Sequence, residues 1–554
     1  MATVERFNEE EITGSNHFLS PAKVTIETAF YRNNTILVSS RREAYKLAKN
    51  SLGTIILDWK VYNPHLLDLD EDTHVLLFND GAVVGRYAKG RRIIGTPGVD
   101  SSYYLSIIRE AIYNTRYRKR KMYHAVSFTG LHEDFMVRNH LLIPEGHENL
   151  LYNWLLNFQH ETPEYSEMYR RSKKYNEPDI YIFSDPDWKH PDFPMGLVIF
   201  DPVHNVAAIL GMRYFGEFKK ATLTLGWGTA SRNGYVACHG GLKKFEYDGK
   251  AFVAAFFGLS GSGKSTLTHA KHGGKYNITV LHDDAFIINL KDKSSIALEP
   301  QYFDKTADYT TSSEDNKYLL TIQNCGATLT KDGKIVPVME DIRNGNGRAI
   351  KSRLWSPNRV DKIDKPIDAI FWIMKDPALP PVIKIEDPTL ASAMGATLAT
   401  KRTSAEAGVD TSKLVIEPYA NPFRTWVLND DFVRFKKLFE DGVSCYVINT
   451  GHFMDKKVPK EVTLSIIESI VEGKATFKDF VGPIKYMEID GFEVKCSDEY
   501  KKALLNSFRM RLEYLEENSK SEGINHISED AVKAMEKVYE EVKKLLREEA
   551  KWGN

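Results

Sequence analysis

The sequence is poor in cysteine, in net charge and in long apolar runs. Its 554 residues include four cysteines, none in a CxxC pair or a metal-finger spacing, which excludes a disulfide scaffold and fits a reducing compartment. The 74 basic and 75 acidic residues nearly cancel, so no overall field favours nucleic acid or an anionic membrane. No window reaches the ~18 uninterrupted apolar residues of a membrane span, and the acidic N-terminus lacks an apolar signal core. We therefore expect a cytoplasmic protein without nucleic-acid or membrane partners, as a monomer or small homo-oligomer.

What is present is the composition of an ordinary globular protein. Hydrophobic residues make up 42% and charged residues 27% of the chain, which is enough apolar surface to offset the entropy of ordering. A chain of 554 residues exceeds what one hydrophobic core usually organises. We therefore expect two or three domains, or two lobes.

Short apolar runs alternate with helical periods along the chain, which predicts an α/β fold. The Gly- and Ser-rich stretch Gly226–Gly234 is interpreted as a connector. The tail Asp498–Glu549 has a helical period with many Glu and Lys, which is typical of packed helices with a solvated face. We predict an N-terminal lobe over residues 1–235 and a C-terminal lobe over residues 236–554 that ends in this helical tail. The runs interpreted as strands or helices include Thr35–Val38, Thr54–Leu57, His74–Phe78, Tyr104–Tyr113 and Glu148–Phe158.

The segment Gly258–Ser265 reads GLSGSGKS and fits the phosphate-loop pattern GxxxxGK[ST]. It follows the apolar strand Ala251–Phe257 and precedes a helix-like stretch, which is the context that the pattern requires. Glycines permit the tight bend that points successive N–H groups at phosphate oxygens. Lys264 is predicted to reach the β- and γ-phosphates, and Ser265 to hold the bridging metal. The alternative is a flexible Gly/Ser loop. The predicted nucleotide-binding residues here are Gly258, Leu259, Ser260, Gly261, Ser262, Gly263, Lys264, Ser265 and Thr266.

Two adjacent carboxylates follow the loop. Asp283 and Asp284 end an apolar strand about twenty residues on, where phosphate-loop enzymes supply a second metal-binding carboxylate. Paired carboxylates beside a triphosphate require a cation between them, so we predict a metal site here. The alternative is an Asp pair in a strand-end turn.

An ordered series of further motifs resembles the ATP-type phosphoenolpyruvate carboxykinase family, between about Tyr123 and Gly491. The phosphate loop and VLHDDAF belong to this series. The other motifs are ILGMRYFGEFKK (Ile209–Lys220), VACHGG (Val236–Gly241), ATLTKDGKIVPV, NGNGR (Asn344–Arg348), LPPV (Leu379–Val382), IEPYANPF (Ile416–Phe423) and YVINTG (Tyr446–Gly451). The resemblance implies a two-lobed α/β enzyme whose C-terminal lobe is a carboxykinase-type nucleotide-binding domain. It also implies a small-molecule substrate and ATP with Mg²⁺ and Mn²⁺ as cofactors.

The resemblance also implies site residues. Lys220, His239 and Asp284 match the manganese ligands, which requires a neutral Lys220 because an ammonium has no lone pair. Lys219 beside it would stay charged. A solvated lysine pair and a turn histidine are the alternatives. Arg348 would contact transferring phosphoryl oxygens, and Lys305 resembles another phosphate-proximal lysine, each with a surface ion pair as its alternative. The predicted catalytic residues are Lys220, Lys264, Asp283 and Arg348.

The sequence departs from the family pattern at the predicted substrate and nucleotide contacts. Leu131 stands after FTG, where the family has an arginine for the substrate carboxylate, and Ala407 stands at a second arginine position. Losing one bidentate arginine would cost about 2–5 kcal/mol of affinity unless another cation replaces it. Candidate replacements are Arg138 or the pair Arg91–Arg92 at the first position, and Lys401 with Arg402 at the second. The acidic motif is altered as well, with His282 and Ala285 flanking the two aspartates.

Three functions are consistent with these residues. The first is the family reaction, in which oxaloacetate and ATP give phosphoenolpyruvate, ADP and CO₂. The second is a diverged kinase that uses the same phosphate and metal residues on a different small molecule. The third is a non-enzymatic ATP-binding protein, against which the intact Lys264, Ser265 and acidic pair argue. Phosphoenolpyruvate formation from oxaloacetate distinguishes the first from the other two.

Overall fold

The computed structural model describes residues 3–4, 6–79, 81, 85–259, 261–340, 345–401, 413–495 and 497–545. The chain divides into two compact units. Unit 1 contains Met1–Thr229 and Leu298–Pro357, and unit 2 contains Ala230–Ala297, Asn358–Thr403 and the described residues that follow. Each is a mixed α/β unit. Leu298–Pro357 belongs to unit 1, although it follows the division into lobes that the sequence predicts after residue 235. The two lobes and the two compact units are therefore different divisions of the chain, and the lobes stay a prediction.

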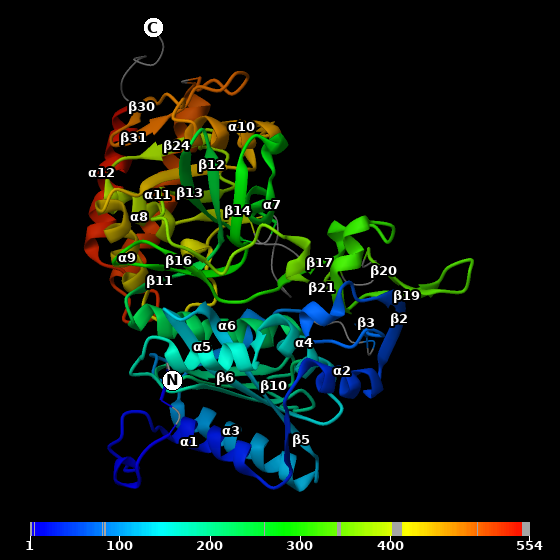
Figure 1. The fold of residues 1–554 in the computed structure, drawn as a ribbon. Coiled ribbons are helices and arrows are strands. Elements are labelled where there is room, and N and C mark those ends of the chain that lie inside the picture. The colour runs from blue at the N-terminus through cyan, green and yellow to red at the C-terminus, as the bar shows by residue number, and fades with distance from the viewer. Residues whose placement is uncertain are drawn as a thin grey trace. The chain divides into compact units, whose positions relative to one another are not determined.

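Unit 1 is built on an eight-stranded mixed sheet in the order β1-β5-β6-β8-β10-β9-β4, with β7 paired to β5. Within this unit, helices α1 and α3 lie on one side of the sheet and α4, α5 and α6 on the other (Figure 1). The strands are β1 Thr35–Val38, β4 Arg91–Ile93, β5 Met122–His132, β6 Phe135–Pro144, β7 Gln159–His160, β8 Ile180–Asp185, β9 Leu197–Asp201 and β10 Val206–Leu210. The helices of the unit are α1 Pro21–Thr28, α2 Arg41–Asn50, α3 Ser101–Tyr117, α4 Glu148–Asn157, α5 Pro163–Arg171 and α6 Phe215–Arg232.

Local sequence signals explain where several of these helices begin. The side chains of Ser20 and Ser40 each accept a hydrogen bond from the backbone N–H of the residue three positions later. The Asp100 side chain accepts two such bonds, from the residues two and three positions later. These side chains satisfy N–H groups that the first helical turn leaves unpaired. Ile26 of α1 and Ile108 of α3 are then buried against the sheet in one apolar core.

A second, five-stranded sheet of unit 1 joins distant parts of the chain. Its order is β17-β21-β18-β3-β2, and Thr321 of β18 pairs in parallel with Leu76 of β3. This pairing is why Leu298–Pro357 belongs to unit 1. The strands of this sheet are β2 Thr54–Lys60, β3 His74–Phe78, β17 Tyr302–Lys305, β18 Leu319–Gln323 and β21 Arg348–Lys351. A separate hairpin, β19 Gly326–Leu329 with β20 Ile335–Val338, lies between β18 and β21 in the chain.

Unit 2 is built on an eight-stranded sheet in the order β14-β12-β13-β23-β27-β24-β31-β30 and a four-stranded sheet in the order β11-β15-β16-β22. The strands of these sheets are β11 Tyr235–His239, β12 Gly241–Tyr247, β13 Lys250–Phe257, β14 Asn277–His282, β15 Ala285–Asn289, β16 Ser295–Ala297, β22 Lys362–Ile363, β23 Ala369–Met374, β24 Val382–Ile385, β27 Ser444–Asn449, β30 Lys478–Val481 and β31 Ile484–Tyr486. Small pairs are formed by β25 Ala399–Lys401 with β26 Leu414–Ile416 and by β28 His452–Phe453 with β29 Lys456–Lys457.

Helices pack on the large sheet of unit 2 around aromatic side chains. Leu267 and Ile467 bury α7 and α10 against strands that carry Phe256 and Phe371. Trp372 of β23 contacts Phe435 of α9, with ring centroids 5.1 Å apart. The helices are α7 Lys264–His269, α8 Pro388–Ala396, α9 Leu428–Glu440, α10 Lys460–Val471, α11 Asp498–Ser519 and α12 Glu529–Leu545.

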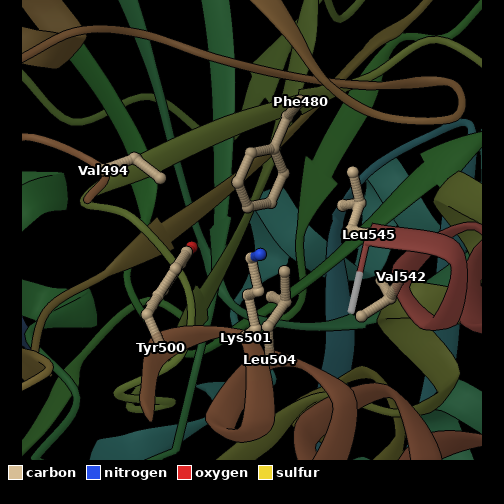
Figure 2. Close-up of a pocket in the computed structure, with 7 residues that line it drawn as sticks. All are labelled: Phe480, Val494, Tyr500, Lys501, Leu504, Val542 and Leu545. Atoms are coloured by element: carbon tan, nitrogen blue, oxygen red, sulfur yellow. The ribbon is translucent and has the colours of Figure 1, made fainter. Parts of the chain in front are cut away.

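A small apolar pocket lies between β30, α11 and α12 of unit 2. Figure 2 shows its lining side chains facing one another. Its volume of about 10 Å³ has room for about one water molecule. We therefore assign it no ligand. The lining residues are Phe480, Val494, Tyr500, Lys501, Leu504, Val542 and Leu545.

The predicted strands and helices are confirmed, with one correction. The connector predicted at Gly226–Gly234 is wrong, because α6 continues to Arg232. A Cβ atom on Gly226 would lie 2.7 Å from Thr129 Cγ2, so the small residue serves close packing of the helix on β5. Among the described residues, no helix is long and apolar enough to cross a membrane.

Candidate functional site

The phosphate loop of unit 2 leaves the sheet beside two other strand ends. Strands β13, β23 and β27 are parallel neighbours, with Phe257 opposite Trp372 and Met374 opposite Asn449. Their carboxyl ends therefore meet at one edge of the sheet, where open α/β sheets bind ligands. The residues that follow β13 are Gly258–Ser265, and α7 begins at Lys264.

Glycine is required at two points of the loop. Gly263 has φ +99°, a left-handed conformation that side chains rarely adopt. A Cβ atom on Gly258 would lie 2.3 Å from Ser262 Oγ. Leu259 and Ser262 are buried, whereas Ser265 and Thr266 are exposed on α7. Of the predicted loop residues, Ser260 lies outside the described ones.

Lys264 and His239 converge on one carboxylate. Lys264 Nζ lies 3.1 Å and His239 Nε2 3.0 Å from Asp284 Oδ1. Lys264 and His239 are both buried. The sequence predicts these three residues at a common site, and within unit 2 they are in contact.

The other nitrogen of His239 is bound by backbone. His239 Nδ1 donates to the carbonyl oxygen of Ala420, in the segment IEPYANPF. In the neutral tautomer this leaves a lone pair on Nε2, which faces the Asp284 oxygen. Two acceptors at this distance require a proton or a metal cation between them. A carboxylate suits Mn²⁺ and an imidazole suits a first-row transition-metal ion, so these two residues fit a transition-metal site better than a Mg²⁺ site. The described residues contain no group of three or more His, Cys, Asp or Glu that could hold a metal ion.

Asp283 faces a different partner from Asp284. Its Oδ2 lies 3.4 Å from His269 Nε2 of α7. Burial raises the pKa of Asp283, but the hydrogen bond and charge of His269, with smaller contributions from His282 and Lys264, hold it well below its usual range. His282 Nδ1 accepts hydrogen bonds from the backbone N–H groups of Asp284 and Ala285. Asp283 therefore ties α7 to the strand end, while Asp284 contacts Lys264 and His239.

The lysine pair of α6 lies in unit 1. Lys219 Nζ is 3.0 Å from Glu299 Oε1, and both side chains are fully buried. Asn157 Nδ2 donates to the other carboxylate oxygen at 2.6 Å. This ion pair fits a charged Lys219. Lys220 is half-buried, with Nζ 5.6 Å from the ring centroid of Trp227.

The paired strands β17 and β21 bring Lys305 and Arg348 near helix α6. Lys305 pairs with Arg348 across β17 and β21. Phe303, two residues before Lys305, has its ring centroid 5.5 Å from Lys219 Nζ and 5.5 Å from the ring of Phe215. The N-terminus of α6 is also anchored, because the N–H of Phe215 donates to Gln323 Oε1, and Gln323 is the β18 partner of Arg348. Three predicted cations, Lys219, Lys305 and Arg348, thus lie within one part of unit 1, together with Lys220.

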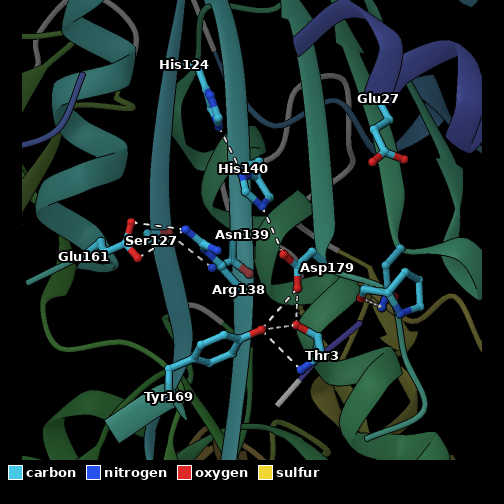
Figure 3. A network of polar contacts seen from close by, with 12 residues as sticks. Thr3, Glu27, His124, Ser127, Arg138, Asn139, His140, Glu161, Tyr169 and Asp179 are labelled. Atoms are coloured by element: carbon cyan, nitrogen blue, oxygen red, sulfur yellow. Dashed lines mark hydrogen bonds and ion pairs between the residues drawn. The ribbon is translucent and has the colours of Figure 1, made fainter. Parts of the chain in front are cut away.

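Of the three arginines considered as replacements at the Leu131 position, Arg91 and Arg138 have carboxylate partners, and Arg92 Nε donates to the Tyr104 hydroxyl at 2.8 Å. Leu131 is buried in β5. Arg138 Nη2 lies 3.2 Å from Glu161 Oε1 (Figure 3), and Arg91 Nη2 lies 3.3 Å from Glu217 Oε2 of α6. Arg86 is a further arginine near α6 that no sequence motif marks. Its neighbour Tyr87 donates its N–H to Glu217 Oε1 at 2.9 Å, which brings this segment to the first turn of α6. At the second departure, Lys401 is exposed in β25, and Arg402 and Ala407 lie outside the described residues.

Three supporting residues also escaped the sequence analysis. The Ala420 carbonyl orients His239, Glu299 pairs with Lys219, and Gln323 joins α6 to β18. Ala420 lies in the motif IEPYANPF, and Glu299 lies six residues before the predicted Lys305, so their positions were a usable signal. Nothing in the local sequence distinguishes Gln323.

Comparison with known proteins identifies the same family as the sequence motifs. A family model described as phosphoenolpyruvate carboxykinase matches residues 71–498. The phosphoenolpyruvate carboxykinase (ATP) of Aeropyrum pernix is 27% identical over 292 residues, which cover 50% of this chain and 58% of that protein. The enzyme of the same name from Dictyostelium discoideum is 22% identical over 467 residues, 77% of each chain. With the match extending over most of its length, the chain belongs to the ATP-type phosphoenolpyruvate carboxykinase family.

Proposed function

We propose that this chain is an ATP-dependent phosphoenolpyruvate carboxykinase, which converts oxaloacetate and ATP to phosphoenolpyruvate, ADP and CO₂. The observation that carries the proposal is the convergence of Lys264 and His239 on Asp284 behind a phosphate loop. The family and the names of both relatives support the carboxykinase reaction over a kinase for another substrate. Among the described residues, the buried Cys238, Cys325 and Cys445 form no disulfide, which supports a reducing compartment such as the cytoplasm.

The nucleotide would bind at the phosphate loop. Its backbone N–H groups, from Gly258 to Thr266, would contact the phosphates, and Lys264 would neutralise the β- and γ-oxygens. The Ser265 hydroxyl, exposed on α7, would take part in holding Mg²⁺. His239 Nε2 and Asp284 would hold Mn²⁺ together with a neutral Lys220. When bound, these metals would supply Lewis-acid stabilisation of developing oxygen charge.

The reaction needs no covalent enzyme intermediate. The bond between the β-carboxylate and its carbon breaks, CO₂ leaves, and the electron pair forms the enolate of pyruvate. The enolate oxygen then attacks the γ-phosphorus while the bond to the ADP oxygen breaks. Lys264, Lys305 and Arg348 would stabilise negative charge on the phosphoryl oxygens, and Asp283 would keep α7 in register with the metal-binding aspartate.

A cation for the substrate carboxylate is also needed, because Leu131 cannot provide one. Arg91 and Arg138 are engaged by Glu217 and Glu161. We assign this role to Arg86, whose neighbour Tyr87 is bound by Glu217, one helical turn before Lys220. A bidentate guanidinium there would offset the desolvation of the carboxylate.

A coupled assay with oxaloacetate, ATP, Mg²⁺ and Mn²⁺ tests the proposal directly. Phosphoenolpyruvate and ADP should form in equal amounts, and Lys264→Ala should abolish both. Lys437→Met, which changes an exposed lysine paired with Asp441, serves as the matched lysine control and should leave the rate unchanged. ADP without phosphoenolpyruvate, or neither product, would favour a kinase of another substrate.

A further inference from the structure

Two side chains outside the phosphate loop bind its carbonyl groups. Lys375 Nζ donates to the carbonyl oxygen of Gly261 at 2.8 Å. Thr450 Oγ1 donates to the carbonyl oxygen of Ser262, also at 2.8 Å. These are adjacent peptide groups of the loop, so the path of the backbone is fixed at two consecutive points without the use of its N–H groups.

The sheet explains why these two residues reach the loop. Lys375 and Thr450 each follow the last residue of a strand, and those last residues, Met374 and Asn449, are register partners on β23 and β27. Since β23 is also the parallel neighbour of β13, all three strand ends open at the same edge. Lys375 and Thr450 therefore stand beside the loop that leaves β13.

Asn449 joins the two strand ends through its side chain. Its Nδ2 donates to the carbonyl oxygens of Asp376 and Leu379, each at 2.8 Å, and its Oδ1 accepts from the N–H of Gly451 at 3.0 Å. Asn449 is fully buried. The turns that carry Lys375 and Thr450 are thus held to each other.

A buried ion pair holds the Lys375 turn from the other side. Asp376 Oδ2 lies 2.8 Å from Arg511 Nη1 and accepts a hydrogen bond from Ser507 Oγ at 2.6 Å. Both charged side chains are almost completely buried, and Arg511 belongs to α11. The position of Lys375 is therefore set by the C-terminal helices as well as by the sheet.

We propose that Lys375 and Thr450 are positioning residues that hold the phosphate loop in its nucleotide-binding conformation before ATP arrives. They act through the loop carbonyls, while the loop N–H groups stay available for phosphate. A preorganised loop binds more tightly because less ordering accompanies binding. The inference rests on the proposed function only in taking ATP as the ligand.

The electrostatics of Lys375 agree with this role. Burial, and then repulsion from Lys401, lower the pKa of Lys375. Its ammonium is therefore costly to maintain in the free protein and is favoured by an anion on the loop. A bound triphosphate and the Lys375 hydrogen bond should stabilise each other.

Hydrogen exchange of the nucleotide-free full-length protein tests whether Lys375 and Thr450 hold the phosphate loop. Lys375→Met and Thr450→Val should increase exchange at Gly261–Lys264 by about tenfold, since each loses one hydrogen bond of the loop. Lys375→Arg and Thr450→Ser, which keep a donor, should stay near wild type, as should Lys437→Met. Unchanged exchange in both disruptive variants would overturn the proposal.

Binding of MgATP, measured by calorimetry on the same variants, tests the consequence. Lys375→Met should weaken binding about tenfold, because more ordering of the loop then accompanies binding, and its KM for ATP should rise more than its kcat falls. Weaker binding with unchanged exchange would mean that Lys375 contacts phosphate directly, and this also contradicts the inference. If the wild type binds no ATP, the proposed function fails. The exchange experiment still shows whether Lys375 and Thr450 order the loop.

Discussion

Lys305 and Arg348 lie directly opposite each other on the antiparallel strands β17 and β21. Like charges in this relationship destabilise a sheet by about 0.2–1 kcal/mol, and Arg348 is buried. Asp308 interacts electrostatically with both side chains and offsets part of this repulsion, and under the proposed function the phosphoryl oxygens of ATP would offset the rest.

Lys305→Met should therefore separate stability from activity. Removing the repulsion should leave the free energy of unfolding unchanged or raise it by up to about 1 kcal/mol, while kcat falls at least about tenfold. Urea unfolding and the coupled assay measure the two quantities. A variant that is clearly less stable would show that Lys305 is a structural residue.

Asp284→Asn should remove the proposed metal ligand while keeping the shape of the side chain. We expect a loss of about 100-fold or more in kcat with little change in thermal stability, because the amide oxygen can still accept from Lys264. Mn²⁺ affinity, followed by electron paramagnetic resonance, should fall in parallel. Asp283→Asn provides the comparison, since its primary defect should be in stability rather than in Mn²⁺ affinity.

The buried pair Lys219–Glu299 should be sensitive to the loss of one partner. Glu299→Leu leaves an unpaired buried ammonium, and we expect a loss of about 3–5 kcal/mol in the free energy of unfolding. The double variant Lys219→Met with Glu299→Leu should recover most of that loss, although activity should not return. A double-mutant cycle from urea unfolding gives the coupling, and additive effects would contradict a direct pair.

Lys243 should make stability depend on pH above neutrality. Its Nζ donates to the carbonyls of Leu267 and Ala270 at 2.6 and 3.2 Å, and lies 3.0 Å from His272 Nε2. Burial, partly countered by Glu468, lowers the pKa of Lys243 to about 7, whereas an unfolded lysine titrates near about 10.4. Between these values the unfolded chain binds more protons, so this contribution to stability falls as the pH decreases from about 10 to 7.

Comparison with Lys243→Met isolates this contribution. The difference in the free energy of unfolding, wild type minus variant, should increase from pH 7 to pH 10. Urea unfolding at several pH values measures it. A difference that does not vary with pH would mean that Lys243 keeps an ordinary pKa in the folded protein.

Arg86→Gln should raise the KM for oxaloacetate about 10- to 100-fold and leave the KM for ATP within a factor of about two. Arg138→Gln is the matched comparison, because its partner is Glu161, and its effect should be on stability. Equal oxaloacetate kinetics in wild type and Arg86→Gln would assign the carboxylate contact to another residue.

The phosphate loop and its acidic partners were predictable from sequence, because they depend on short-range requirements. Gly258 and Gly263 are dictated by local backbone geometry, and Asp284 follows a strand of clear apolar pattern. The metal-binding roles of His239 and Lys220 came from the family resemblance and remain proposals.

The supporting residues were not predictable, because their partners are distant in the chain. Glu299 is identified by Lys219, and Lys375 by Gly261, only once the fold brings them together. The error at Gly226–Gly234 has a similar origin, since a glycine that allows close packing of a helix looks in sequence like a glycine of a loop.

The pairing of β3 with β18 has a consequence for biosynthesis. Leu76 leaves the ribosome long before Thr321, its partner in the sheet, and the phosphate-loop segment is translated in between. Unit 1 therefore cannot finish folding as the first product of translation, and β3 keeps one exposed hydrogen-bonding edge in the nascent chain. Such an edge is prone to pairing with other chains. Truncation after residue 229 should thus yield an aggregating fragment, and chaperones that bind exposed strands should associate with the nascent protein until residue 357 has emerged.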